Sequence, residues 1–127
     1  MKLEYTMLEE LRLAGNDIEG AVGRMMENQA LLNKFLLGFP DNARILNVKK
    51  ALGNSEFKSL EEAVHKIKGT AGNLGLTALY KIASTFTDDV RRKNRPAFAD
   101  DFKLLEDEYL KVTNIINKYI VPVPPQS

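Results

Sequence analysis

The sequence predicts an all-α protein in which antiparallel helices pack as a bundle. Apolar residues recur at spacings of three and four along most of the chain, which is the period of an amphipathic helix. No segment shows the strict alternation of a half-buried strand. The breaks between the helical segments are short, and short connections between long helices make sequence neighbours antiparallel. With 127 residues, the chain is large enough to bury one hydrophobic core.

The first part of the chain predicts short helices separated by strong breaks. These helices cover residues 1–13, about 16–26 and about 28–38. Asn16 or Asp17 caps the second and Asn28 caps the third, because short polar side chains accept hydrogen bonds from the free N–H groups of a first turn. Residues 1–14 form a helical lead-in, and the main domain spans residues 15–120.

Four longer helices follow, over about residues 41–53, 55–75, 77–93 and 96–119. Each carries an apolar stripe that predicts its buried side. The stripe residues are Ile45, Val48 and Leu52 in the first, Leu60, Ala63, Ile67, Ala71 and Leu74 in the second, Leu79, Ile82, Ala83, Phe86 and Val90 in the third, and Phe98, Phe102, Leu105, Tyr109, Val112 and Ile116 in the fourth. The second helix can begin at Ser55 or at Ser59, because Ser59–Glu62 has the form of a capping box. The prolines within residues 121–127 cannot continue the last helix and predict a tail.

His65, the only histidine of the chain, lies on the polar side of the helix over residues 55–75. At about 100° per residue, its ring points away from the apolar stripe of that helix. Lys68 lies three residues further on and shares its face. Gly69 lies four residues further on, and a mid-helix glycine costs about 1 kcal/mol relative to alanine. We interpret Gly69 as clearance for a large partner, whereas Gly72 can equally serve close helix packing.

The segment His65–Gly75 resembles the motif of histidine-containing phosphotransfer (HPt) domains, written H-x-aliphatic-K-G-small-small-x-x-aliphatic-G. The segment Asn16–Ala21 and the order and lengths of the helices extend this resemblance over residues 15 to 119. It implies an antiparallel four-helix bundle with short additional N-terminal helices. It also implies a phosphotransfer intermediate that relays phosphoryl groups between the aspartates of receiver domains.

The resemblance gives roles to individual residues. It implies that Nε2 of His65 accepts the phosphoryl group. A neutral imidazole offers a lone pair for this near neutral pH, because histidine side chains titrate near about 6.5. Lys68 stabilises the phosphate oxygens by its charge, and Gly69 gives steric access. Docking of the partner is expected at exposed groups beside the site, assigned to Ile18, Val22, Gly72, Leu76, Thr87 and Arg91.

Thr87 marks a departure from the family. Many members carry a glutamine about six turns beyond the histidine, facing it, and the corresponding stretch here, Thr85–Asp89, has none. The hydroxyl of Thr87 is the expected replacement.

Several function classes are excluded or disfavoured by the sequence. The net charge of +1 gives no global nucleic-acid footprint. A glycine-rich phosphate loop and a paired acidic metal cluster are absent from the sequence, so we expect no ATP-dependent kinase activity, no cofactor and no metal on this chain. No apolar stretch approaches the ~20 residues that span a bilayer. The N-terminus lacks a signal-peptide apolar region, and zero cysteines fit a reducing compartment, so the cytoplasm is the expected location.

The expected partners are response-regulator receiver domains, a hybrid sensor histidine kinase, or both, with Mg²⁺ held by the receiver domain. The chain itself is expected to be a monomer. Met1 and the proline-rich tail favour a free-standing protein over a fragment of a hybrid kinase. The alternative function, from another class, is a non-catalytic helical adaptor that binds a signalling partner.

Overall fold

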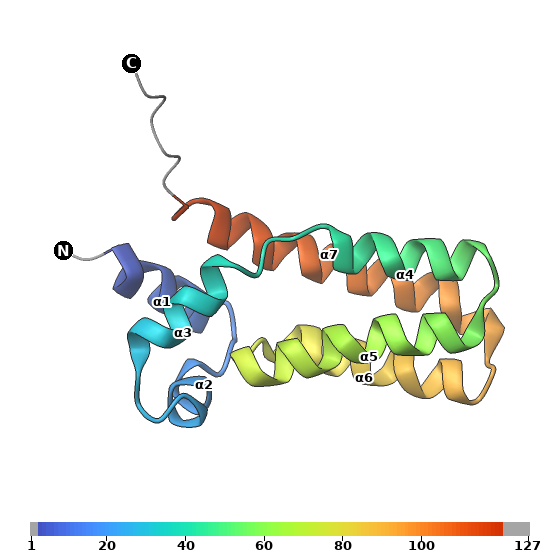
Figure 1. The fold of residues 1–127 in the computed structure, drawn as a ribbon, viewed down its shortest axis with the longest axis horizontal. Helices are drawn as coiled ribbons and strands as arrows, with labels where there is room; N and C mark the ends of the chain where they lie inside the picture. The colour runs from blue at the N-terminus through green and yellow to red at the C-terminus, as the bar shows by residue number, and fades with distance from the viewer. Residues whose placement is uncertain (1–2, 121–127) are drawn as a thin grey trace, which may run out of the picture.

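The computed structural model describes residues 3–120, and over this range it is built of helices and loops without a strand (Figure 1). The predicted tail at residues 121–127 lies outside the described residues. The elements are α1 (Leu3–Leu13), α2 (Ile18–Arg24), α3 (Gln29–Leu37), α4 (Ala43–Gly53), α5 (Phe57–Leu74), α6 (Thr77–Arg91), the 3-10 turn η1 (Arg95–Ala97) and α7 (Phe98–Asn117). The predicted all-α class is confirmed.

Helices α4 to α7 form the four-helix bundle. Helix α5 packs against α4 and α6, and α7 packs against α6 and α4, so the four helices close a ring around one core. Figure 1 shows them running lengthwise, with α1, α2 and α3 gathered at the end of the bundle where α5 finishes. The bundle with short additional N-terminal helices therefore agrees with the prediction.

The core is formed by the apolar stripes of all these helices. Buried side chains include Leu32 and Leu36 of α3, Ile45 and Val48 of α4, Leu60, Val64, Ile67, Ala71 and Leu74 of α5, Leu79, Ala83, Phe86 and Val90 of α6, and Leu105, Tyr109, Val112 and Ile116 of α7. Most of the predicted stripe residues are buried. In α5, Val64 is fully buried while Ala63 is only partly buried, so the stripe lies slightly to one side of its predicted position. In α4, Leu52 is partly buried against the core, and Ala51 is buried in addition to the predicted residues.

The lead-in helix α1 belongs to the same core as the bundle. Its buried residues Met7, Leu8 and Leu11 are part of one continuous hydrophobic cluster. At its C-terminal end, the buried Asn16 donates from Nδ2 to the carbonyl of Leu11 at 2.9 Å. The hydroxyl of Tyr119, beyond α7, donates to Glu10 at 2.5 Å. Hydrogen bonds therefore join α1 to the loop before α2, through Asn16, and to the segment after α7, through Tyr119.

Two predicted caps are confirmed and one is wrong. The side chain of Asp17 accepts from the N–H of Gly20, and the side chain of Asn28 accepts from the N–H of Leu31, each at 3.0 Å. Helix α5, however, begins at Phe57 and has no capping side-chain hydrogen bond. Ser55 takes a left-handed φ of 55°, which turns the chain into the helix before the predicted capping box is reached.

Candidate functional site

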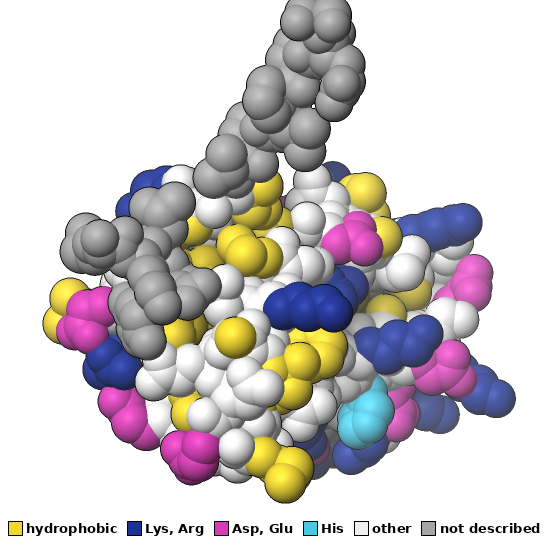
Figure 2. Space-filling model, turned by 60° about the vertical axis from the view of Figure 1, so that its left-hand side comes forward, with side chains coloured by type: hydrophobic (Ala, Val, Ile, Leu, Met, Phe, Trp, Pro, Cys, Tyr) yellow, Lys and Arg dark blue, Asp and Glu magenta, His cyan; other side chains and the backbone are white. Residues whose placement is uncertain are grey.

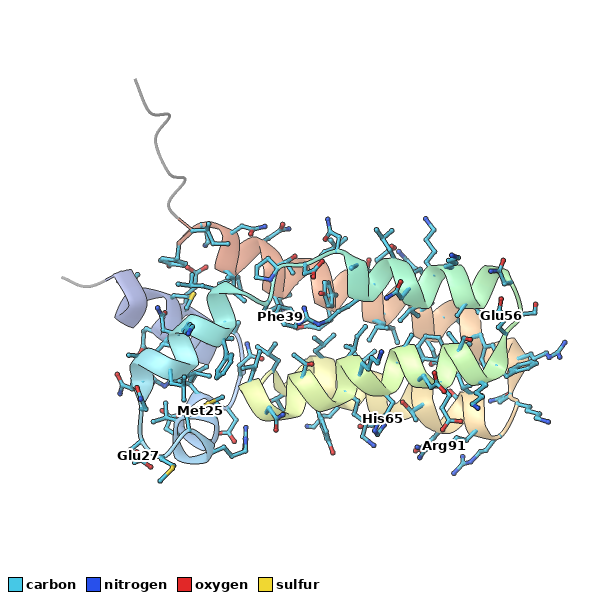
Figure 3. All side chains as sticks on the ribbon, in the orientation of Figure 1. Met25, Glu27, Phe39, Glu56, His65 and Arg91 are labelled. Atoms are coloured by element: carbon cyan, nitrogen blue, oxygen red, sulfur yellow. The ribbon has the colours of Figure 1, made fainter. Side chains whose placement is uncertain are left out.

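His65 lies in the middle of α5, on the side that faces away from the core. Its neighbours Val64 and Ile67 are fully buried, whereas the imidazole itself is exposed. Figure 2 shows the ring at the molecular surface among basic and acidic side chains, and Figure 3 shows it pointing outward from the bundle. The expected exposure of His65 is confirmed, because helical periodicity separates it from the buried stripe.

The space beside the imidazole is open at Gly69. A Cβ atom built on Gly69 would meet nothing within 4 Å, so this glycine is not needed for close packing between helices. Gly69 itself is exposed and lies one turn beyond His65 on the same face. The structure therefore leaves open space at Gly69, which the predicted clearance requires.

Lys68 shares this face with His65 and is partly buried. Its ammonium nitrogen lies 5.9 Å from the centroid of the Tyr80 ring, which is contributed by α6. Tyr80 was not predicted as a site residue, because its proximity to Lys68 arises from the packing of α6 on α5 and not from either helix alone. The sequence-level signal that could have identified it is an aromatic residue outside the predicted apolar stripe of its helix, and in the structure Tyr80 is 41% exposed.

Gly72 and Gly75 serve the packing of this region. A Cβ on Gly72 would lie 3.1 Å from Cδ1 and 3.2 Å from Cε1 of Tyr80, so the absence of a side chain makes room for that ring. Gly75 ends α5 in the left-handed conformation, with φ of 72°, which glycine adopts without strain. Its carbonyl accepts the N–H of Asp17 at 2.8 Å.

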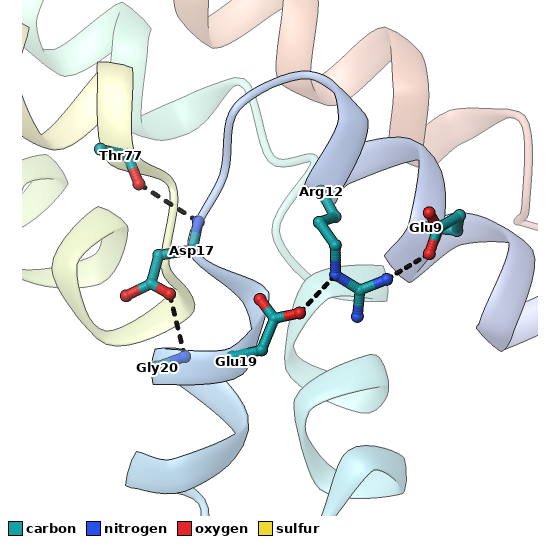
Figure 4. Close-up of polar contacts among 6 residues, drawn as sticks. All are labelled: Glu9, Arg12, Asp17, Glu19, Gly20 and Thr77. Carbon is teal, nitrogen blue, oxygen red and sulfur yellow. Dashed lines mark hydrogen bonds and ion pairs between the residues drawn. The ribbon is translucent and has the colours of Figure 1, made fainter.

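The loop before α2 is fastened to the end of α5 at this point. The N–H of Asp17 also lies 3.2 Å from the hydroxyl oxygen of Thr77, and the carboxylate of Asp17 caps α2 through Gly20 (Figure 4). On the far side of the loop, Nε of Arg12 lies 2.6 Å from Glu19. These contacts position α2 beside the C-terminal half of α5.

Four of the residues assigned to docking are buried, so their expected exposure is wrong. Ile18 and Val22 face inward because α2 packs its apolar side against α1, α3 and α5. Leu76 is fully buried and forms part of the hydrophobic core at the turn between α5 and α6. Thr87 is also fully buried, and its hydroxyl donates to the carbonyl of Ala83 at 2.7 Å instead of facing the histidine.

Arg91 is exposed but already has a partner. Its Nε lies 3.0 Å from Oε2 of Glu61, one turn before His65 on α5. Figure 3 shows Arg91 further than His65 toward the end of the bundle at which α5 begins. Arg91 therefore stands at the edge of the candidate site as a half-exposed ion pair.

Two hollows flank the C-terminal half of α5. One, of about 330 Å³, is lined by Asp17, Arg24, Ala71, Gly72, Gly75, Thr77 and Tyr80. The other, of about 210 Å³, is lined by Met25, Phe35, Phe39, Arg44, Thr70, Asn73 and Leu74. Phe35 is 49% exposed, so the second hollow has an apolar rim. Both hollows lie beyond the histidine along α5, because the residues of this helix that line them are Thr70 to Gly75.

Residues 3–120 contain no group of three or more His, Cys, Asp or Glu side chains arranged to hold a metal ion. Within the same described part of the chain, none of the helices has the length and apolar character required to cross a bilayer.

Comparison with models of protein families shows which family the chain belongs to. The model of the Hpt domain matches residues 7–114, which include α2 to α6 and most of α1 and α7. Comparisons with curated proteins and with solved structures gave no match. The match starts within α1, in accordance with the shared core of this helix and the bundle. Because the match covers more than half of the chain and the fold agrees with it, this protein belongs to the Hpt domain family and has a histidine phosphotransfer role in a phosphorelay.

Proposed function

We propose that His65 takes a phosphoryl group from the aspartyl phosphate of one receiver domain and passes it to the aspartate of another. The observation that carries this proposal is the exposed imidazole beside the open space at Gly69. Only a group that a second protein can approach closely is able to exchange phosphate with that protein's carboxylate.

The reaction is a direct displacement at phosphorus. The lone pair of Nε2 attacks the phosphorus, the bond between phosphorus and the aspartyl oxygen breaks, and its electron pair stays on the leaving carboxylate. The second transfer reverses these events with a new carboxylate as the attacking group. Most of the catalysis is positioning and charge stabilisation, as in other phosphoryl transfers. Lys68 supplies a positive charge from one turn further along α5.

The proposal assigns Mg²⁺ to the receiver domain, where it would balance the charge of the phosphoryl oxygens. The expected partners are receiver domains, including one carried by a hybrid sensor histidine kinase, and the chain acts as a monomer. We propose the cytoplasm as its location, with the zero cysteine count as support. Docking is proposed at the exposed face around Gly69 and at the two hollows further along α5, which Arg24, Asn73 and Phe35 help to line, in place of the buried residues first assigned.

The test is phosphoryl transfer from receiver domains charged with acetyl phosphate. We expect label on the wild-type chain that is labile in acid and stable in base, as is characteristic of phosphohistidine. His65→Gln should abolish the label without changing the helical circular dichroism. Lys66→Gln is the matched control, because Lys66 is the exposed neighbour of His65 on α5. Label that survives His65→Gln would refute the proposal, and receiver binding without any label would favour the non-catalytic adaptor.

A further inference from the structure

We propose that Tyr80 is a positioning residue for Lys68: its ring, seated on Gly72, holds the ammonium group on the face of His65. This inference rests on the proposed function, because the held charge matters only if phosphate arrives at the imidazole. It concerns residues on two different helices, since Lys68 and Gly72 belong to α5 and Tyr80 belongs to α6.

The first observation is the distance between the cation and the ring. The nitrogen of Lys68 lies 5.9 Å from the centroid of Tyr80, within the about 6 Å over which a ring face attracts a cation. Lys68 is partly buried, whereas its neighbours Lys66 and Gly69 are exposed. The lysine chain is therefore laid along the protein surface towards α6 and does not extend freely into solvent.

The second observation is the seat of the ring. Gly72 lies four residues after Lys68, so the two positions are neighbours on one face of α5. The space that a Cβ of residue 72 would need is taken by the edge of Tyr80, at 3.1 and 3.2 Å. An alanine there would press on the ring that contacts the lysine. Gly72 thus makes room for the Tyr80 ring, and this ring in turn contacts the ammonium group of Lys68.

The third observation is that the charge of Lys68 is not neutralised. The helix positions three and four residues away are His65, Ala71, Val64 and Gly72, and none of them is acidic. The acidic residues of α5 nearest to Lys68 in sequence are Glu61 and Glu62. Glu61 is paired with Arg91 at 3.0 Å, and Glu62 forms no ion pair with Lys68. Within the described residues, no carboxylate lies within ion-pair distance of Lys68.

A ring and a carboxylate differ in how much of the charge of Lys68 they leave available to phosphate. A carboxylate would hold the ammonium but would also compete with the phosphoryl oxygens for its charge. A ring face restricts the flexible side chain and leaves the positive charge available to an anion. Tyr80 would therefore restrict the Lys68 side chain to the face of α5 that also carries His65, with its charge free for phosphoryl oxygens.

The test is a double-mutant cycle on the rate of transfer from a charged receiver. We expect Tyr80→Leu to slow transfer by about 2- to 5-fold, which corresponds to a cation–π contact at a partly exposed site. Tyr80→Phe, which keeps the ring, should restore the rate. In a Lys68→Ala background, Tyr80→Leu should cause no further loss. An equal loss from Tyr80→Phe, or an equal loss with and without Lys68, would overturn the positioning role.

A second readout is independent of phosphate. Protons on the carbon next to the Lys68 nitrogen should show a ring-current shift that disappears in Tyr80→Leu and persists in Tyr80→Phe. The same protons of Lys66 serve as the control within each spectrum. Absence of the shift in the wild type would overturn the contact itself. Wild-type protein that shows the shift but accepts no phosphoryl group would instead refute the proposed function, so the two failures are distinguishable.

Discussion

Nε of Arg91 and Oε2 of Glu61 lie 3.0 Å apart and join α6 to α5 one turn before His65. Both side chains are partly exposed, and exposed ion pairs contribute about 0–1 kcal/mol. The pair nevertheless affects which charges on this surface are unpaired. Glu61 and Arg91 neutralise each other, whereas Lys68, on the same face of α5 as His65, has no carboxylate partner among the described residues.

The modest energy of this pair is itself testable. Arg91→Gln and Glu61→Gln should each change the free energy of unfolding by less than about 1 kcal/mol, and the coupling between them should be equally small. Urea unfolding of both single variants and the double variant measures this coupling. A coupling of several kcal/mol would mean that the pair is a structural requirement of the bundle.

Removing the charge of Lys68 should impair transfer without unfolding the protein. We expect Lys68→Ala to slow phosphoryl transfer by about 10- to 100-fold, because a charge-assisted hydrogen bond contributes about 1.5–3 kcal/mol. Single-turnover transfer from a charged receiver measures the rate. Lys66→Ala is the matched control on α5 and should transfer at the wild-type rate. Equal rates for the two variants would remove the role of Lys68.

Gly69 offers a test in which stability and function move in opposite directions. Gly69→Ala meets nothing within 4 Å, so the helix should gain about 1 kcal/mol from the better propensity of alanine. Transfer should become slower, because the new methyl group stands beside the imidazole. Urea unfolding and transfer kinetics on the same sample measure both effects. A variant that is more stable and equally fast would show that clearance is unnecessary.

Gly75 should respond in the opposite way. Its φ of 72° disfavours a side chain, and a Cβ would collide with the carbonyl oxygen of Asp17. We expect Gly75→Ala to lower the free energy of unfolding by about 1–3 kcal/mol. Gly53→Ala is the control, since a Cβ there would meet nothing within 4 Å and should be tolerated. Similar stability of the two variants would contradict this explanation of Gly75.

The parts of the site that lie on one long helix were predictable from the sequence. The exposure of His65 and the clearance at Gly69 follow from the period of α5 alone. Ile18 and Val22 were wrongly expected to be exposed because α2 has only seven residues. A helix of two turns is too short for its apolar pattern to show which of its sides is buried. Thr87 was misplaced because a hydroxyl bonded to the carbonyl one turn back can be buried at little cost.

Contacts between helices were beyond sequence reasoning. The ring of Tyr80 reaches Lys68 only because Gly72 allows α6 to approach at that point. Asp101, in the first turn of α7, is of a residue type that is usually exposed to solvent, but here it is buried, with 8% exposure. Its burial depends on how the corner between α6 and α7 closes, which no pattern within α7 reports.

Asp101 and Asp89 should make stability depend on pH. Burial first, then a hydrogen bond shared with Asp89 and the charges of Asp89 and Asp100, raise the pKa of Asp101 to about 7. The same hydrogen bond, together with one from Asn94, lowers the pKa of Asp89. When both carboxyls are ionised, Oδ2 of Asp101 has no donor among the described residues. The pair therefore holds one proton across the corner of the bundle at mildly acidic pH.

The sign follows from the protons bound in each state. The ordinary pKa of 3.8 applies to Asp101 in the unfolded chain, so between about pH 4 and about pH 7 the folded state keeps a proton that the unfolded state has released. The contribution of Asp101 to the free energy of unfolding should fall as pH rises through this window and level off above it. Asp101→Asn, whose amide can still donate to Asp89, should flatten this part of the profile and be more stable than the wild type at about pH 8.

Urea unfolding at a series of pH values measures both profiles, and their difference isolates Asp101 from the other titrating groups. Asp100→Asn is the matched control, since it removes an exposed neighbouring charge and should retain most of the slope. A difference profile that stays flat from about pH 4 to about pH 7 would show that Asp101 is ionised throughout. The ionised carboxylate would then cost the folded state nothing relative to the unfolded chain, and Asp101→Asn would gain no stability over the wild type as pH rises.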